Sequence, residues 1–208
     1  MTKSSQSKHF SMIPLKNQLL PLIDKRALVL IGLMGAGKSV IGKRISAILD
    51  LPFYDSDQEI EKTVQMTIPE FFKIYGETKF RSLEQDIILN LITKSPLVLA
   101  TGGGAYINVN IRKAIHENGI SIWLKADINT LMQRVLKKLP TRPLLQTKDP
   151  TETMQKLMEQ RYPIYAQANL AIDNNHQANI HIIAKHIIRS VQHYLHKEIN
   201  DRNNEYAS

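Results

Sequence analysis

The stretch Gly32–Ser39, which reads GLMGAGKS, decides the fold of this chain. It follows the apolar run Ala27–Ile31 and precedes a helix-like segment that begins at Val40. When a buried strand runs into a glycine-rich turn and then into a helix, the first helical N–H groups lack partners and face the space beyond the strand. Phosphate groups bind in such places. We therefore predict that a nucleoside triphosphate binds here, with a chance match in a βα turn as the alternative.

The residue types of this loop agree with a phosphate site, since the spacing G-x-x-x-x-G-K-S is complete. Gly32, Gly35 and Gly37 allow positive φ angles and a close approach of the backbone to a ligand. Lys38 offers a positive charge to phosphate oxygens, and Ser39 offers a hydroxyl group to a magnesium ion. The loop therefore indicates a nucleotide bound together with Mg²⁺.

The composition is that of one domain without covalent cross-links. The 208 residues include no cysteine, which excludes disulfides and thiolate metal sites. Lys and Arg number 27 against 19 Asp and Glu, and this net charge of +8 suits either nucleic acid or small anionic substrates. The sequence has no run of five basic residues and no interleaving of basic and aromatic residues, so we expect no nucleic-acid partner.

The hydropathy pattern gives no sign of a membrane protein, because no apolar stretch reaches the ~18 residues of a spanning helix. Several histidines occur near the C-terminus, and His193 and His196 share one helical face, but no acidic or cysteine partner surrounds them. We therefore expect no metal there. We expect a cytoplasmic monomer that binds no membrane.

The ends of the chain differ from its middle. Residues 1–24 lack sustained periodicity and contain two prolines, so we predict a flexible arm; a start rich in serine and poor in acids also suits a transit peptide, but it contains no arginine. Residues 25–197 then form a single domain. Residues 198–208 are polar, and we predict that this tail is disordered.

Within the domain, five short apolar segments alternate with helical segments, which favours a parallel sheet built from βαβ units. The strand candidates are residues 27–31, 52–55, 97–101, 121–125 and 170–173. Thr67 and Glu70 have the spacing of a capping box, so a helix begins there. Gly76 interrupts it, and the helical pattern that follows places Arg81 and Glu84 next to each other.

Residues 137–150 contain three prolines and several basic residues without periodicity. A segment of this kind, late in a nucleotide-binding domain, suits a mobile lid that closes over phosphates. An ordinary exposed basic loop is the alternative.

Two acids follow the second strand candidate. Asp55 and Asp57 alternate along an extended chain, so both carboxylates can face the same site, one toward a metal and one toward an acceptor hydroxyl. The alternative is that one of them, or Ser56, only caps the next helix.

Three glycines, residues 102–104, follow the third strand candidate, where bare N–H groups can approach a substrate closely. The alternative interpretation of these three glycines is a flexible turn.

Six motifs in this order closely resemble the shikimate kinase family over residues 27–175. They are GLMGAGKS, FYDSD, GETKFRSLE, ATGGG, TRPLL and RYPIY. The resemblance implies a three-layer α/β P-loop NTPase fold with a five-stranded parallel sheet, helices on both faces, substrate-binding helices within about residues 56–92, and a mobile lid. It also implies transfer of the γ-phosphoryl group of ATP to the 3-hydroxyl of shikimate in aromatic amino-acid biosynthesis.

The resemblance also assigns residues. It implies ATP contacts from Gly35, Ala36, Gly37, Lys38, Ser39, Val40, Arg134 and Arg142, where Arg134 packs near adenine and Arg142 belongs to the lid. It implies shikimate contacts from Asp57, Arg81, Glu84, Gly102, Gly103, Gly104 and Arg161. Ser39 and Asp55 lie on the magnesium side in that scheme. Lys38, Asp57 and Arg142 are its catalytic residues.

The chemistry of the acceptor agrees with these residue types. A small triol with one carboxylate calls for guanidinium groups, such as those of Arg81 and Arg161, and for an acid such as Asp57. A kinase for gluconate or a nucleoside monophosphate is the rival enzyme. A nucleotide-gated switch is the rival without catalysis, but we find no N-K-x-D element that would bind guanine.

Overall fold

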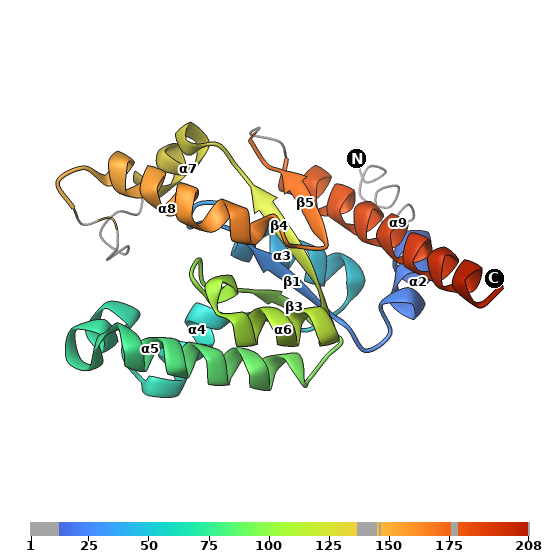
Figure 1. Cartoon of the computed structure of the whole chain (residues 1–208), viewed down its shortest axis with the longest axis horizontal. Helices are drawn as coiled ribbons and strands as arrows, with labels where there is room; N and C mark the ends of the chain where they lie inside the picture. The colour runs from blue at the N-terminus through green and yellow to red at the C-terminus, as the bar shows by residue number, and fades with distance from the viewer. Residues whose placement is uncertain (1–12, 137–144, 146, 176–178, 208) are drawn as a thin grey trace, which may run out of the picture.

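One sheet of five parallel strands forms the centre of the molecule, with the order β2-β3-β1-β4-β5 (Figure 1). The computed structural model describes residues 13–136, 145, 147–175 and 179–207. The strands are β1 (Ala27–Ile31), β2 (Phe53–Asp55), β3 (Val98–Ala100), β4 (Gly119–Lys125) and β5 (Leu170–Asp173). All of β1 and β3 is buried, which is typical of parallel strands covered on both faces. The predicted five-stranded parallel sheet is confirmed.

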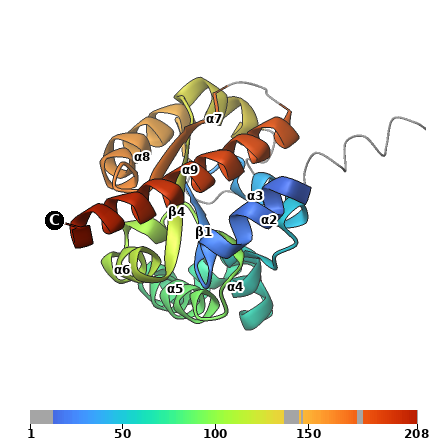
Figure 2. The same ribbon diagram turned by 90° about the vertical axis from the view of Figure 1, so that its right-hand side faces the viewer.

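Helices cover both faces of the sheet, as predicted. They are α2 (Ile13–Ile23), α3 (Lys38–Leu49), α4 (Ser56–Val64), α5 (Ile68–Ile92), α6 (Val109–Asn118), α7 (Ile128–Val135), α8 (Pro150–Tyr165) and α9 (Ile180–Ala207), with the 3₁₀ turn η1 (Ala105–Ile107). On one face α3 and α9 contact the strands and each other, and α6 contacts β1 and β4 on the other face. Figure 2 shows α2 beside α9, outside α3.

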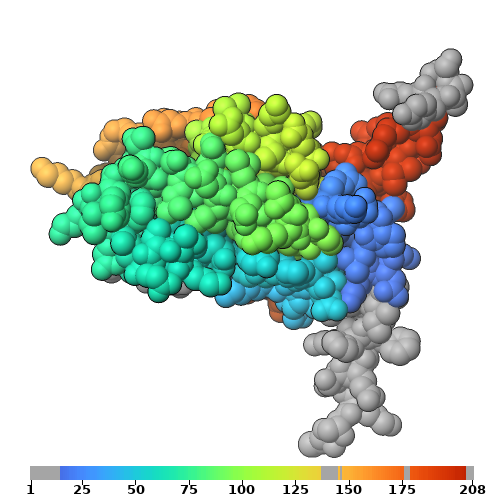
Figure 3. All heavy atoms as spheres, turned by 90° about the horizontal axis from the view of Figure 1, so that it is seen from below, coloured from blue at the N-terminus to red at the C-terminus, as the bar shows by residue number. Residues whose placement is uncertain are grey.

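The helix α5 begins at the predicted capping box. The Thr67 hydroxyl accepts a hydrogen bond from the Glu70 N–H, and the Glu70 carboxylate accepts one from the Thr67 N–H at 2.8 Å. Gly76 has φ 76°, a conformation that a glycine adopts without strain, and it kinks the helix there. The segment from α4 through the first half of α5 lies at the opposite end of the molecule from α2 (Figure 3).

Both ends of the chain differ from the prediction. Residues 13–23 form α2 rather than a flexible arm, and residues 198–207 continue α9 rather than forming a disordered tail. Leu19 and Ile23 are fully buried and α2 packs against α9, so tertiary contacts stabilise a helix whose own sequence pattern is weak. Residues 1–12 lie outside the described part of the chain.

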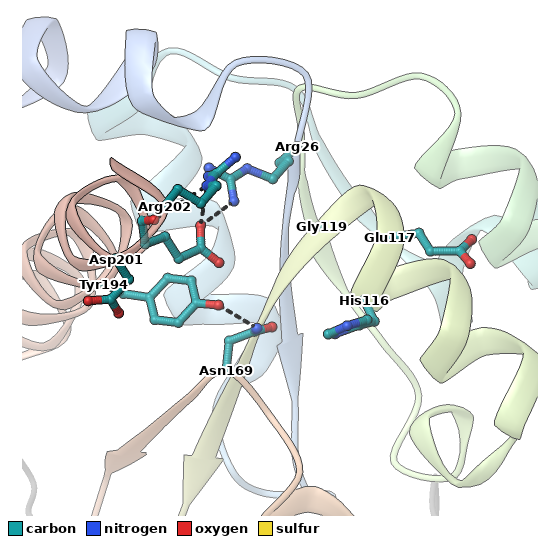
Figure 4. Close-up of a pocket in the computed structure, with 9 residues that line it drawn as sticks. Arg26, His116, Glu117, Gly119, Asn169, Tyr194, Asp201 and Arg202 are labelled. Carbon is teal, nitrogen blue, oxygen red and sulfur yellow. Dashed lines mark hydrogen bonds and ion pairs between the residues drawn. The ribbon is translucent and has the colours of Figure 1, made fainter. Parts of the chain in front are cut away.

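Side chains at the amino edge of the sheet connect α9 to the residues that precede β1 and β5. Arg26, just before β1, donates to the Glu198 carboxylate at 2.8 Å and to the Leu22 carbonyl at 3.0 Å. The Asn169 amide donates to the Tyr194 hydroxyl at 2.9 Å. These groups line a pocket of about 410 Å³ with His116, Glu117, Gly119, Asp201 and Arg202 (Figure 4). The hydrogen bonds explain why α9 stays ordered beyond residue 197.

We expect Glu198→Gln to lower the free energy of unfolding by about 1 kcal/mol, which is roughly 2–4 °C in Tm for a chain of this size. Burial alone would raise the pKa of the Glu198 carboxyl, but hydrogen bonds from Tyr194 and Arg26 outweigh it and lower the pKa. A carboxyl group with a lowered folded-state pKa stabilises the protein at neutral pH and loses that contribution as the pH falls through this pKa. Thermal melts of both proteins against pH provide the measurement.

The difference in Tm between wild type and Glu198→Gln should therefore shrink in acid, below the ordinary glutamate pKa of about 4.3. Glu117→Gln is a suitable control, because Glu117 lines the same pocket but its nearest cation, Lys113, lies 4.0 Å away and both side chains are exposed. Equal melting temperatures for wild type and Glu198→Gln at neutral pH would contradict the expected contribution.

Candidate active site

The carboxyl ends of β1, β2 and β3 meet at one edge of the sheet, because the three strands are parallel and in register. The phosphate loop follows β1, Asp55 ends β2, and the three glycines follow β3. Ligand sites in open α/β sheets lie outside these strand ends. The sheet therefore brings together three motifs that are far apart in the sequence.

The phosphate loop has the predicted backbone geometry. Gly35 has φ 83°, and Gly37, the residue that precedes α3, has φ 90°. A Cβ atom at position 35 would lie 2.7 Å from the Val135 side chain, so this position requires glycine for space as well as for its φ angle. Lys38 is nearly buried, and its Nζ donates to the carbonyl oxygens of Gly32 at 2.7 Å and Leu33 at 3.0 Å. The ammonium group thus lies inside the loop.

Arg134 and Asn174 support this loop from two other elements. Arg134, on α7, donates to the carbonyl oxygens of Gly35 at 3.4 Å and Asn174 at 3.2 Å. Asn174 follows β5, is buried, and donates from its amide nitrogen to the Ala36 carbonyl at 2.8 Å. The resemblance placed Arg134 near the nucleotide and residues 171–175 at the adenine edge, but it did not single out Asn174, whose contact with Ala36 spans 138 residues of sequence.

Ser39 and Asp55 lie together beside the loop. The Ser39 hydroxyl donates to Asp55 Oδ2 at 2.5 Å, and Asp55 Oδ1 accepts the Asp57 N–H at 3.1 Å. Asp55 therefore also caps α4, which was the alternative for this residue. A hydroxyl and a carboxylate next to a phosphate loop are oxygen ligands of the kind that Mg²⁺ prefers, so the residues fit a magnesium ion.

Asp57 and Glu84 approach the glycine loop, which we define as residues 102–104. A Cβ atom added to Gly102 would lie 2.7 Å from an oxygen of Asp57 and 2.7 Å from Glu84 Oε1, so only glycine leaves room for both carboxylates. Glu84 is 1% exposed. Burial is the largest influence on the Glu84 carboxyl and raises its pKa, while the Arg81 guanidinium acts against that shift.

Arg81 and Glu84 form the pair that the helical spacing predicted. Arg81 Nη1 donates to Glu84 Oε2 at 2.7 Å, and a second carboxylate, that of Glu77, lies 3.2 Å from Arg81 Nη2. A Cβ atom at Gly104 would lie 2.6 Å from Arg81 Nη1. The guanidinium group of Arg81 therefore packs directly on the last glycine of the loop.

Arg161, on α8, reaches the same place from the opposite side. Its Nη1 would lie 3.5 Å from a Cβ atom on Gly103. Within the described residues, the buried Arg161 Nη1 and the buried Glu84 Oε1 have no hydrogen-bond partner. Buried polar groups without partners carry a substantial desolvation cost, which a polar ligand between them would offset. The two unpaired atoms are therefore candidate contacts for a polar ligand.

Two residues that fix the glycine loop were not predicted as functional. The fully buried Ser56 accepts the Gly102 N–H at 2.8 Å, and the Tyr165 hydroxyl donates to the Gly103 carbonyl. Sequence reasoning considered Ser56 only as a helix cap. Tyr165 lies one helical turn after Arg161 in the motif RYPIY, and that spacing is the signal that could have identified it.

Two further predictions concern the edges of the site. Val40 is 54% exposed and lines a pocket of about 480 Å³ along α3, together with Lys43, Arg44, Ala47, Asn179, Ile180 and His181. Arg142 and most of the predicted lid, residues 137–144 and 146, lie outside the described residues.

The sheet order and the phosphate loop after β1 define the chain as a P-loop kinase. Within that class it belongs to the shikimate kinase family, because the family model for shikimate kinase matches residues 34–192. A shikimate kinase of Bartonella henselae is 68% identical over 206 residues, which cover 99% of this chain and 97% of that protein. The resemblance of the six motifs to this family is thereby confirmed.

Further relatives and a solved structure support the same family. A shikimate kinase of Brucella suis biovar 1 is 48% identical over 177 residues, covering 85% of this chain and 88% of that protein. The structure of a shikimate kinase from Acinetobacter baumannii in complex with shikimate has a TM-score of 0.78 and 32% identity, covering 82% of this chain and 95% of that chain. Across the described part of the chain, no helix is long and apolar enough to cross a membrane.

Proposed function

We propose that this chain transfers the γ-phosphoryl group of ATP to the 3-hydroxyl of shikimate, giving shikimate 3-phosphate and ADP. Membership of the shikimate kinase family supports this activity. The observation that carries the proposal is the group of buried, partly unpaired charges on Arg161 and Glu84 next to the glycine loop. A small acceptor with one carboxylate and several hydroxyls matches such a set of cations and carboxylates.

The acceptor and the nucleotide would be adjacent in this arrangement. A Cβ atom on Gly103 would lie 3.5 Å from the Met34 N–H nitrogen and 3.6 Å from the Gly32 carbonyl oxygen, both in the phosphate loop. Phosphoryl transfer depends mainly on holding the attacking oxygen close to and in line with the transferred group. Contact between the two loops supports direct transfer from one site to the other.

Each residue has a role in the proposed reaction. The N–H groups at the start of α3 hold the phosphates, and the Lys38 ammonium exchanges its carbonyl acceptors for phosphate oxygens. Asp57 accepts a hydrogen bond from the attacking hydroxyl. Arg81 and Arg161 bind the acceptor carboxylate while Glu84 orients Arg81. Arg142 completes the set as the lid residue that stabilises charge on the transferred group.

Magnesium belongs to the proposal as well. Ser39 and Asp55 would hold the ion, which supplies positive charge to the phosphate oxygens when bound. Arg134 and the pocket beside Val40 would border the nucleoside part of ATP. We further expect a monomer in the cytoplasm, with ATP and shikimate as its partners and without nucleic-acid or membrane binding.

The test is ADP formation from ATP and Mg²⁺ with different acceptors. We expect rapid ADP release with shikimate and only background hydrolysis with gluconate or a nucleoside monophosphate. A gluconate or nucleotide kinase would show the reverse preference. A nucleotide-gated switch would hydrolyse ATP slowly at a rate that no acceptor changes. Mass spectrometry of the product identifies shikimate monophosphate directly.

A further inference from the structure

Tyr165 is a fully buried residue that carries a polar group into the core. It ends α8, and its ring lies 6.0 Å from that of Trp123 and 6.4 Å from that of Tyr106, measured between centroids. A buried phenol needs a hydrogen-bond partner, and the Tyr165 hydroxyl donates to the carbonyl oxygen of Gly103. The aromatic contacts therefore hold this hydroxyl on the middle residue of the glycine loop.

This hydrogen bond sets the direction of a peptide group. In a trans peptide the C=O and the N–H point in opposite directions, and the Gly103 carbonyl shares its plane with the Gly104 N–H. A carbonyl held toward Tyr165 therefore turns the Gly104 N–H away from it. Within the described residues, neither the Gly103 nor the Gly104 N–H donates a hydrogen bond to the protein. Both donors remain for a ligand.

Tyr165 also lies beside Arg161. The two residues are one turn apart on the same face of α8, and the positive charge of Arg161 acts to lower the pKa of Tyr165. Burial, the largest influence, raises the pKa of Tyr165 to about 12, which keeps the hydroxyl protonated at neutral pH. The same residue thus contacts the glycine loop and lies one helical turn from the arginine whose Nη1 has no partner in the described structure.

We propose that Tyr165 is a positioning residue for the phosphoryl acceptor: its hydroxyl holds the Gly103 carbonyl, so that the N–H donors of the glycine loop are preset, next to the Arg161 guanidinium, to bind shikimate. This inference rests on the proposed function. It predicts that Tyr165 contributes to the affinity for the acceptor rather than to the rate of the chemical step, because the hydroxyl acts through Gly103. The nucleotide site should be unaffected.

Tyr165→Phe tests the inference, because it removes one oxygen and keeps the ring. We expect shikimate affinity, measured by calorimetry, to fall about tenfold, which corresponds to about 1.4 kcal/mol. The KM for shikimate should rise by a similar factor, while kcat at saturating shikimate and the Kd of ATP stay within about twofold. If Tyr165 only supported the fold, Tyr165→Phe would lower Tm without reducing the affinity for shikimate more than the affinity for ATP.

Tyr162→Phe is the matched control. Tyr162 lies on the same helix, contacts Tyr165 and also donates to a carbonyl, but that carbonyl belongs to Ala126 rather than to the glycine loop. We expect its shikimate affinity to stay within about twofold of wild type. Ser56→Ala removes the second hydrogen bond that fixes the loop, and it should weaken shikimate binding in the same direction as Tyr165→Phe.

The outcomes separate the inference from the proposed function. A wild type that neither binds nor phosphorylates shikimate would contradict the function. A wild type that does both, with Tyr165→Phe and Tyr162→Phe alike in shikimate affinity, would overturn the role of Tyr165. Equal losses of ATP and shikimate affinity in Tyr165→Phe would also overturn it, because they would show general damage to the fold.

Discussion

Replacing Lys38 by methionine is expected to lower shikimate-dependent ADP formation by about 10³-fold or more, comparable to losing a cation that stabilises phosphoryl transfer. The Lys38 ammonium group is held inside the phosphate loop by the carbonyl oxygens of Gly32 and Leu33, where phosphate oxygens would compete for it. Methionine has a similar length and no charge, so it preserves packing but cannot balance the negative charge of the phosphates. The measurement is a coupled assay at saturating ATP, Mg²⁺ and shikimate.

The fold of Lys38→Met should survive. The substitution leaves two carbonyl oxygens without this donor, but a chain of 208 residues with an extensive core tolerates such a loss. Circular dichroism and thermal melting check this. Lys113→Met serves as the control, because Lys113 is an exposed lysine on α6. Wild-type turnover in a folded Lys38→Met protein would contradict the phosphate-loop assignment.

Much of the fold was predictable because its signals are local. The five strands, the capping box at Thr67 and the interruption at Gly76 each depend on a few neighbouring residues. The pairing of Arg81 with Glu84 was equally predictable, since three residues of helix bring their side chains together. The phosphate loop combines a strand, a turn and a helix in one short stretch, and that is why it identified the fold class.

The terminal helices escaped prediction because their stability is not local. The α2 segment contains Pro21 and a weak apolar pattern, and it is ordered because Leu19 and Ile23 are buried where α2 packs against α9. The last turns of α9 are polar, yet Glu198 reaches Arg26, which lies 172 residues earlier in the chain. A sequence pattern has no means of showing a contact of that separation when no motif accompanies it.

The same limit applies within the candidate site. The glycine loop was predictable as a place of close approach, but its two anchors were not identified, because Ser56 and Tyr165 reach it from 46 and 62 residues away and only the helical spacing of Tyr165 from Arg161 indicated one of them. Neither side chain has a charge that would single it out. The structure adds these anchors and the unpaired state of Arg161 Nη1 in the described residues, and both follow only from three-dimensional packing.

Asp57→Asn is expected to lower kcat by about 10²–10⁴-fold, the usual contribution of a group that accepts the proton of a nucleophile. The asparagine keeps the size of the side chain and its place beside Gly102, where an oxygen of Asp57 would lie 2.7 Å from an added Cβ atom. It removes the negative charge that orients the attacking hydroxyl and favours loss of its proton. The nucleotide site is held by other residues, so the Kd of ATP should change by less than about threefold.

The measurement compares single-turnover transfer with ATP binding in the same preparation. Glu59→Gln is the matched control, since Glu59 lies two residues later on α4 and is only partly buried, and it should retain wild-type rates. A second comparison, with Asp57→Glu, separates charge from position: a carboxylate one methylene too long should recover part of the rate only if the charge itself matters. A loss in Asp57→Asn below about threefold would exclude a direct role, because proton acceptance contributes far more than that. In that case the buried carboxylate of Glu84, which shares the surface of Gly102 with Asp57, would be the next acid to test for contact with the acceptor hydroxyls.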